Sequence, residues 1–310
     1  MKNVQNWKSV HLIGIGGISM SAVAKILLDA GVSVTGSDVY ASEITKDLEE
    51  RGIKIAIGPH DERNIPDQCD GVIHTSAAPD SNPERIATKN RNIQDFDNFQ
   101  FLGAWFKGKR MIVVTGTHGK STVTAILGQI CIAGGLDPTV LVGSKVPGWP
   151  DQNLHLGKSD LVIIEGDEYA KHFLEFHPFA VIINNLELDH TDVYKNIDEL
   201  RKTFERLLRQ TVNQGMVIAN GESTQINTAL KPLIATGKLQ VQKFGHAKNQ
   251  IPGELMDVVV KTKWDKGILS VNISGKDIQL ELESKLIGDY NGMNIASATL
   301  MAKHLGVEDE

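Results

Sequence analysis

The chain has 310 residues, of which 41% are hydrophobic and 23% are charged. This length allows two domains of roughly 100–200 residues each, and the composition excludes a disordered or fibrous protein. The 32 basic and 38 acidic residues give a net charge of −6. Nucleic acid is therefore not expected as a main partner, because no overall basic field is available to bind its phosphate backbone.

The sequence has no apolar segment long enough to insert into or span a membrane. Its N-terminus lacks the apolar core of a signal peptide, and no run of about 18 apolar residues occurs. We therefore expect a cytoplasmic protein with no membrane partner. The two cysteines, Cys69 and Cys131, have no His or Cys at metal-ligand spacing, and we expect both to be free, buried thiols.

Over the first hundred residues, short β-branched runs alternate with helical stretches, as in βαβ units. The pattern loosens into polar and aromatic residues at 94–109, where we place a domain boundary. Residues 1–105 should therefore form a Rossmann-like, doubly wound parallel sheet. We expect its strands at residues 10–15, 32–36, 53–57 and 71–75 and its helices at residues 19–30, 44–51 and 83–90.

A second α/β domain should span residues 106–310. Its last strands alternate apolar and polar residues, which predicts an added antiparallel section with one face in water. We expect parallel strands at 111–115, 139–142, 161–165, 180–184 and 216–219, antiparallel strands at 257–261, 268–273 and 278–283, and helices at 121–133, 197–209 and 293–305.

A glycine loop between the strand at 111–115 and the next helix is the strongest motif. Backbone amides of such a loop and the helix N-terminus bind phosphate, a lysine neutralises it, and a hydroxyl ligates Mg²⁺. The first glycine of the common P-loop spacing is replaced by Val114, and a plain helix start is the alternative. The predicted loop consists of Gly116, Thr117, His118, Gly119, Lys120, Ser121 and Thr122.

Two more buried strands end in polar residues. The strand at 161–165 ends in Glu165, followed by Asp167 and Glu168, and the strand at 180–184 leads to Asp189 and His190. Acids at the carboxyl ends of parallel strands face the ligand crevice, and Mg²⁺ prefers oxygen ligands. The alternatives are a solvated acidic loop and a structural histidine.

The N-terminal loop resembles a dinucleotide fingerprint, although Ser19 stands at its third small position. Asp38, about twenty residues on, is placed to contact a sugar. Both NAD and a nucleotide sugar fit, but an NAD-dependent oxidoreductase would leave the phosphate loop unused. Near the C-terminus, Asn291 and Asn294 lie on one helical face and could contact a base, with an N-cap role for Asn291 as the alternative.

In this order, these segments resemble the Mur ligase family. The resemblance implies an enzyme of peptidoglycan biosynthesis, and hence of cell-wall biogenesis, cell shape and cell division. This ATP-dependent ligase, with Mg²⁺, would join L-alanine to the lactyl carboxylate of UDP-N-acetylmuramate through an acyl phosphate. The first domain would hold the UDP-sugar and the second ATP. The family's C-terminal, amino-acid-binding domain would lie beyond Glu310 and be absent.

The resemblance also implies roles for individual residues. The phosphate loop would bind ATP, with Asn291 and Asn294 on its adenine side. Lys120, Glu165 and His190 would be catalytic, and Ser121, Glu165 and His190 would hold the metal. The residues matched to UDP-sugar binding are Gly14, Gly16, Gly17, Met20, Ser21, Asp38 and Ser76.

Some positions depart from the family pattern. Tyr290 stands where a histidine is usual. Tyr169 and the run from Asn184 to Glu187 resemble a cell-wall recycling relative, which attaches a tripeptide to the same nucleotide sugar. That ligase, and a non-catalytic nucleotide-binding fragment, are the alternative functions.

Overall fold

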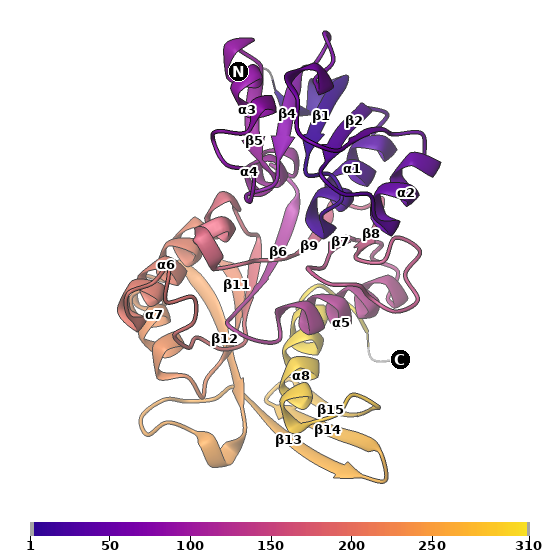
Figure 1. Cartoon of the computed structure of the whole chain (residues 1–310). Coiled ribbons are helices and arrows are strands. Elements are labelled where there is room, and N and C mark those ends of the chain that lie inside the picture. The colour runs from indigo at the N-terminus through magenta and orange to yellow at the C-terminus, as the bar shows by residue number, and fades with distance from the viewer. Residues whose placement is uncertain (1–2, 309–310) are drawn as a thin grey trace. The chain divides into compact units, whose positions relative to one another are not determined.

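The computed structural model describes residues 3–308 and divides into two units (Figure 1). The first unit comprises Met1–Lys107 and Gly143–Leu154, and the second comprises Gly108–Val142 and His155–Glu310. Gly143–Leu154 thus belongs to the first unit, although the predicted second domain, residues 106–310, includes it. Among the described residues, no helix is long and apolar enough to cross a membrane.

The first unit contains a five-stranded parallel sheet in the order β3-β2-β1-β4-β5. The strand order reverses direction between β1 and β4, and ligands bind at such a switch point in doubly wound sheets. The strands are β1 (Ser9–Ile13), β2 (Ser33–Asp38), β3 (Lys54–Ile57), β4 (Gly71–His74) and β5 (Gln94–Asp97). The helices are α1 (Ile18–Asp29), α2 (Glu43–Glu50), α3 (Pro83–Asn90) and α4 (Asn98–Trp105), with short 3-10 turns η1 (Val4–Asn6) and η2 (Glu62–Asn64).

The segment at residues 94–109, where we placed the domain boundary, is regular structure, because it contains β5 and α4. The break between the two units follows α4, between Lys107 and Gly108. Asp97 is the N-cap of α4 and forms a capping box with Gln100. The Asp97 side chain accepts from the Gln100 amide, and the Gln100 side chain accepts from the Asp97 amide. Two aromatic residues of this segment, Phe101 and Phe106, are buried core residues. Trp7 stacks on Phe101 and meets the edge of Phe96. Their burial makes the segment part of the first unit's core.

The second unit contains a ten-stranded sheet in the order β15-β14-β13-β12-β11-β10-β6-β9-β7-β8. Helices α5 and α8 lie against one face, and α6 and α7 lie on the other (Figure 1). The parallel strands are β6 (Arg110–Thr115), β7 (Thr139–Leu141), β9 (Leu161–Glu165), β10 (Ala180–Ile183), β11 (Gly215–Asn220) and β12 (Leu239–Gly245). Short β8 is Leu154–His155, and the antiparallel section is β13 (Val258–Asp265), β14 (Ile268–Gly275) and β15 (Ile278–Ser284). The helices are α5 (Lys120–Ala133), α6 (Ile197–Gln210), α7 (Thr224–Ala235) and α8 (Asp289–His304), with 3-10 segments η3 (Tyr169–Glu175) and η4 (Ala247–Asn249).

The central strands of this sheet have the apolar, β-branched sequences that predicted them. Residues of β6, β9 and β10 are buried almost throughout, so the polar residues that follow them are held at one sheet edge. Helix α7, which contains Pro232, and strand β12 were not predicted. The expectation of two buried thiols is wrong for one of them, because Cys131 is buried but Cys69 is only partly buried.

Candidate nucleotide-binding sites

The predicted phosphate loop lies between β6 and α5, as the sequence indicated. Gly119, the N-cap of α5, is left-handed with φ 81° and makes no side-chain cap. A Cβ there would lie 2.6 Å from Asn294 Oδ1. Gly116 is likewise left-handed, with φ 135°. Both positions therefore require glycine, and the loop passes close to its neighbours.

Helix N-termini in this chain fall into two groups. Five of the described α-helices, α2, α3, α4, α6 and α7, begin with a side-chain cap on a backbone amide. Three others, α1, α5 and α8, begin at Gly17, Gly119 and Gly288 without a side-chain cap. Amides at an uncapped helix N-terminus, aided by the helix dipole, bind anions. The uncapped helices are the ones that the sequence analysis associated with nucleotides.

Lys120 is held inside the loop by a buried acid. Its Nζ donates to both carboxylate oxygens of Glu168, at 2.9 and 3.1 Å, and to the Gly116 carbonyl at 2.8 Å. Glu168 is 1% exposed. Burial raises the pKa of Glu168, although the Lys120 charge opposes this. Glu168 was not among the predicted site residues, because the sequence could not show which acid of the strand end faces the lysine.

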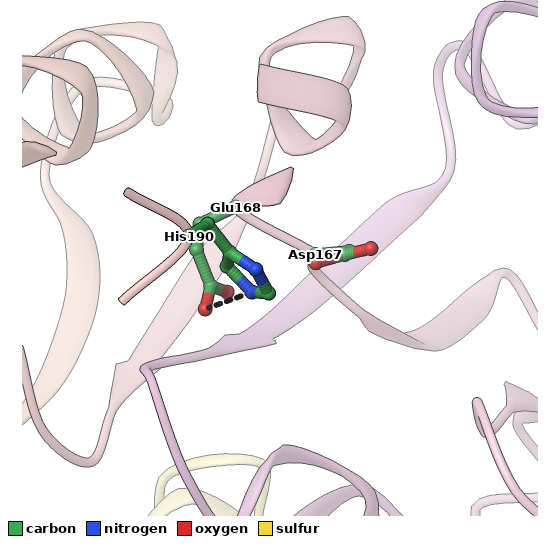
Figure 2. Close-up of side chains that lie close together, drawn as sticks. All are labelled: Asp167, Glu168 and His190. Atoms are coloured by element: carbon green, nitrogen blue, oxygen red, sulfur yellow. Dashed lines mark ion pairs between the residues drawn. The ribbon is translucent and has the colours of Figure 1, made fainter. Parts of the chain in front are cut away.

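The predicted metal-ligating residues separate into two contacts. Ser121 Oγ donates to Glu165 Oε1 at 3.0 Å. His190 Nε2 instead forms an ion pair with Glu168 at 3.8 Å, with Asp167 alongside (Figure 2). Ligand atoms of Asp167, Glu168 and His190 lie within 4.8 Å of one another, so these three side chains could hold a cation. Burial would raise the pKa of Asp167, but the His172 ring and the Tyr169 amide lower it below its usual range.

The segment after β10 supports the phosphate loop. The Asn185 side chain accepts from the His118 amide at 2.7 Å and donates to the His118 carbonyl at 3.1 Å. The Thr117 hydroxyl donates to the Glu187 carbonyl and accepts from the Glu187 amide. These contacts keep the loop in place without using the amides at the start of α5. From the sequence, this segment was expected to be a polar strand end at the ligand edge of the sheet, but its support of the phosphate loop was not predicted.

The asparagines of α8 are buried and bonded to other amides. Asn184 Nδ2 donates to Asn294 Oδ1 at 2.9 Å, Asn294 Nδ2 donates to Asn291 Oδ1 at 3.0 Å, and Asn291 Nδ2 donates to the Ile287 carbonyl at 2.8 Å. Asn291 is not an N-cap, because Gly288 holds that position. Tyr290 is 69% exposed beside them and offers an aromatic surface at the helix start.

In the first unit, the amides of the glycine loop are already bonded within the protein. Gly14 and Ile15 donate to the Ser37 carbonyl at 2.8 and 3.1 Å, and Gly16 donates to Asp38 Oδ2 at 2.8 Å. The loop therefore shapes the site, and the uncapped start of α1 offers amides to an anion. Of the other predicted residues, Met20 and Ser21 are buried at the start of α1, whereas Ser76 is exposed after β4.

Comparison with known proteins finds relatives that cover nearly all of the chain. Residues 9–110 match the model of the Mur ligase family, catalytic domain, and residues 114–302 match that of the Mur ligase middle domain. The UDP-N-acetylmuramate–L-alanine ligase of Clostridium perfringens is 36% identical over 298 residues, which are 96% of this chain and 63% of that protein. The ligase of the same name from Clostridium botulinum is 40% identical over 72% of this chain and 48% of its own.

Solved structures have the same fold. The UDP-N-acetylmuramate-alanine ligase of Thermotoga maritima aligns with a TM-score of 0.80 at 27% identity, over 96% of this chain and 65% of its own. A Neisseria meningitides UDP-N-acetylmuramate:L-alanyl-gamma-D-glutamyl-meso-diaminopimelate ligase is alike in fold, with a TM-score of 0.84 at 24% identity over 97% and 94%. The chain thus spans less than two thirds of the length of the L-alanine ligases that it matches. Because the middle-domain match alone covers more than half of its residues, the chain belongs to the Mur ligase family.

Proposed function

We propose that this chain binds UDP-N-acetylmuramate in its N-terminal domain, residues 1–105, and MgATP in its second domain, residues 106–310. It would serve the ATP-dependent ligation of L-alanine to the lactyl carboxylate, as the names of its relatives indicate. The observation that carries this proposal is the uncapped start of α5, where Lys120 and Ser121 follow a glycine that admits no side chain. A ligase that uses ATP and a nucleotide sugar would act in the cytoplasm.

The ATP phosphates would bind the loop and the first turn of α5. Lys120 would exchange its contact with Glu168 for the terminal phosphates, and the paired oxygens of Ser121 and Glu165 suit a hard cation. When bound, magnesium would lower the electrostatic repulsion between the phosphates and an attacking oxygen. The residues proposed for ATP are Gly116, Thr117, His118, Gly119, Lys120, Ser121, Thr122, Asn291 and Asn294. For the metal, Ser121 and Glu165 would act together, and His190, which contacts Glu168 instead, would help to order a second magnesium or the acyl phosphate.

The diphosphate of the nucleotide sugar would bind the uncapped start of α1. The glycine loop closes tightly against Asp38, and a Cβ at Gly16 would meet that carboxylate at 2.8 Å. Asp38 would thus fix the loop and stand near the sugar. The residues proposed for this substrate are Gly14, Gly16, Gly17, Met20, Ser21, Asp38 and Ser76.

The chemistry follows from the poor reactivity of a carboxylate toward an amine. An oxygen of the lactyl carboxylate would attack the γ-phosphorus of ATP, forming an acyl phosphate and releasing ADP. The amine of L-alanine would then attack the acyl carbon, lose a proton and expel phosphate. Lys120, Glu165 and His190 would act by positioning the reactants and by electrostatic stabilisation, because these two effects dominate phosphoryl transfer.

The test is binding by the 310-residue chain, and turnover with and without a C-terminal Mur ligase domain supplied in trans. Isothermal titration should show binding of both MgATP and UDP-N-acetylmuramate, and Lys120→Met should abolish only the former. ADP release should be measured with L-alanine and with the tripeptide L-alanyl-γ-D-glutamyl-meso-diaminopimelate, and release with the tripeptide alone would assign the recycling reaction instead. Binding of NADH without binding of UDP-N-acetylmuramate would contradict the proposal.

A further inference from the structure

A buried carboxylate joins several elements of the first unit. Glu84, in the first turn of α3, is fully buried. Its Oε2 accepts from the Ser37 hydroxyl at 2.6 Å and contacts His11 Nε2 at 3.2 Å. Its Oε1 accepts from Asn64 Nδ2 at 2.7 Å and the Asp61 amide at 3.4 Å, and it contacts His60 Nδ1 at 3.1 Å. Strands β1 and β2, the turn η2 and the segment before it therefore converge on one side chain.

These contacts keep the carboxylate charged. Burial by itself would raise the pKa of Glu84, but hydrogen bonds from His11, Ser37 and Asn64 outweigh it and lower the pKa from 4.5 to about 2. His11 and His60 are the titratable groups that face the carboxylate. The other ring nitrogen of His11 contacts Thr35 Oγ1 at 2.9 Å. A buried, fully bonded carboxylate fixes its partners more rigidly than an exposed one would.

One of these partners also holds the glycine loop. The Ser37 hydroxyl donates to Glu84, while the Ser37 carbonyl accepts from the amides of Gly14 and Ile15. Gly14 has φ 75°, and a Cβ there would lie 2.6 Å from Thr75 Cγ2. A small shift of Ser37 would therefore displace the amides of Gly14 and Ile15, and the close approach of Thr75 leaves Gly14 no space to compensate.

We propose that Glu84 is a positioning residue for the nucleotide-sugar site, holding the glycine loop at the start of α1 through Ser37. The inference rests on the proposed function, because it assigns the loop to UDP-N-acetylmuramate. The side-chain hydrogen-bond partners of Glu84 do not include a residue assigned to that substrate, so we assign its effect to Ser37. Its effect should reach the loop amides and the affinity of the first unit, and it should leave ATP binding unchanged.

The test uses Glu84→Gln in the 310-residue chain, with Ser37→Ala as a milder variant that removes only the connecting hydroxyl. Asp70→Asn is the matched control: Asp70 accepts from the Lys8 and Ser9 amides at the opposite end of β1. The affinities for UDP-N-acetylmuramate and MgATP are measured by titration calorimetry. Amide exchange of Gly14, Ile15 and the core residue Leu12 is followed by NMR.

We expect Glu84→Gln to weaken UDP-N-acetylmuramate binding about tenfold, which corresponds to the loss of one charged hydrogen bond. Exchange at Gly14 and Ile15 should accelerate more than at Leu12, Ser37→Ala should act in the same direction, and MgATP affinity should not change. Wild-type affinity for UDP-N-acetylmuramate in both variants would overturn the inference. It would also be overturned if Glu84→Gln weakened the binding of both ligands equally and Asp70→Asn had the same effect. If the unaltered chain does not bind the nucleotide sugar, the proposed function fails, and selective exchange at Gly14 and Ile15 still decides whether Glu84 positions the loop.

Discussion

Lys120 and Glu168 form a buried pair in the second unit, with side chains 14% and 1% exposed. The lysine Nζ also donates to the carbonyls of Gly116 and Thr117. In this arrangement, the ammonium compensates a carboxylate that has little access to water. Phosphates that enter the loop would compete with Glu168 for the Lys120 ammonium. Lys120 would therefore contribute both to the stability of the fold and to phosphate binding.

Substitution can separate these two roles. Lys120→Met leaves Glu168 buried without its cation, and we expect the free energy of unfolding to fall by about 3–5 kcal/mol. Lys120→Met/Glu168→Gln leaves no uncompensated charge, so most of the stability should return while MgATP binding stays lost. Urea unfolding and titration calorimetry measure the two effects. A double variant as unstable as the single one would show that Glu168 does not depend on Lys120.

Glu84 should make stability depend on pH in the acid range. Its pKa is lowered from 4.5 to about 2 in the folded chain, so its contribution is present above the unfolded pKa and is lost as the pH falls through the folded one. A shift of this size corresponds to about 3 kcal/mol. In urea unfolding, wild type should exceed Glu84→Gln in stability at neutral pH, and the difference should shrink between about pH 5 and about pH 2. A constant difference would contradict this assignment.

At the scale of elements, the phosphate site depends on how α5 begins. Gly119 and Gly135 are both left-handed, with φ 81° and 74°, but a Cβ at Gly135 would meet nothing within 4 Å. Gly135→Ala should therefore cost only the backbone strain, about 1–2 kcal/mol. Gly119→Ala adds a clash with Asn294 and should cost about 2–4 kcal/mol and weaken MgATP binding. Chemical denaturation and calorimetry of the pair provide the check, and equal effects would exclude a steric requirement at Gly119.

Elements with continuous apolar sequences were predictable, and those that depend on distant partners were not. Strands β6, β9 and β10 were found because each is a β-branched run that the sheet buries on both faces. Helix α4 was missed, although the pairing of Asp97 with Gln100 is a capping signal that the sequence contains. In α7, an interior proline argued against a helix that packing nevertheless stabilises.

The same limit applies to the candidate sites. The phosphate loop was visible because its residues are contiguous, whereas the contacts of Glu168 and Glu84 join segments far apart in the chain. Strand-end position predicts that Glu165, Asp167 and Glu168 share an edge, but it cannot show which acid meets Lys120. A glutamate in the first turn of a helix is ordinarily a solvated residue favoured by the helix dipole. Only the convergence of β1, β2 and η2 makes Glu84 a buried one.

At the scale of the whole molecule, each unit carries its own uncapped helix start beside a glycine loop, α1 in the first and α5 in the second. Each nucleotide should therefore protect its own loop. In hydrogen-exchange mass spectrometry of the 310-residue chain, UDP-N-acetylmuramate should slow exchange in peptides covering residues 14–21, and MgATP in those covering residues 116–122. Lys120→Met should remove the second protection and leave the first within about twofold, since ligand protection follows occupancy. Protection of residues 116–122 by the nucleotide sugar alone, or loss of both protections in Lys120→Met, would show that the two sites are not separate.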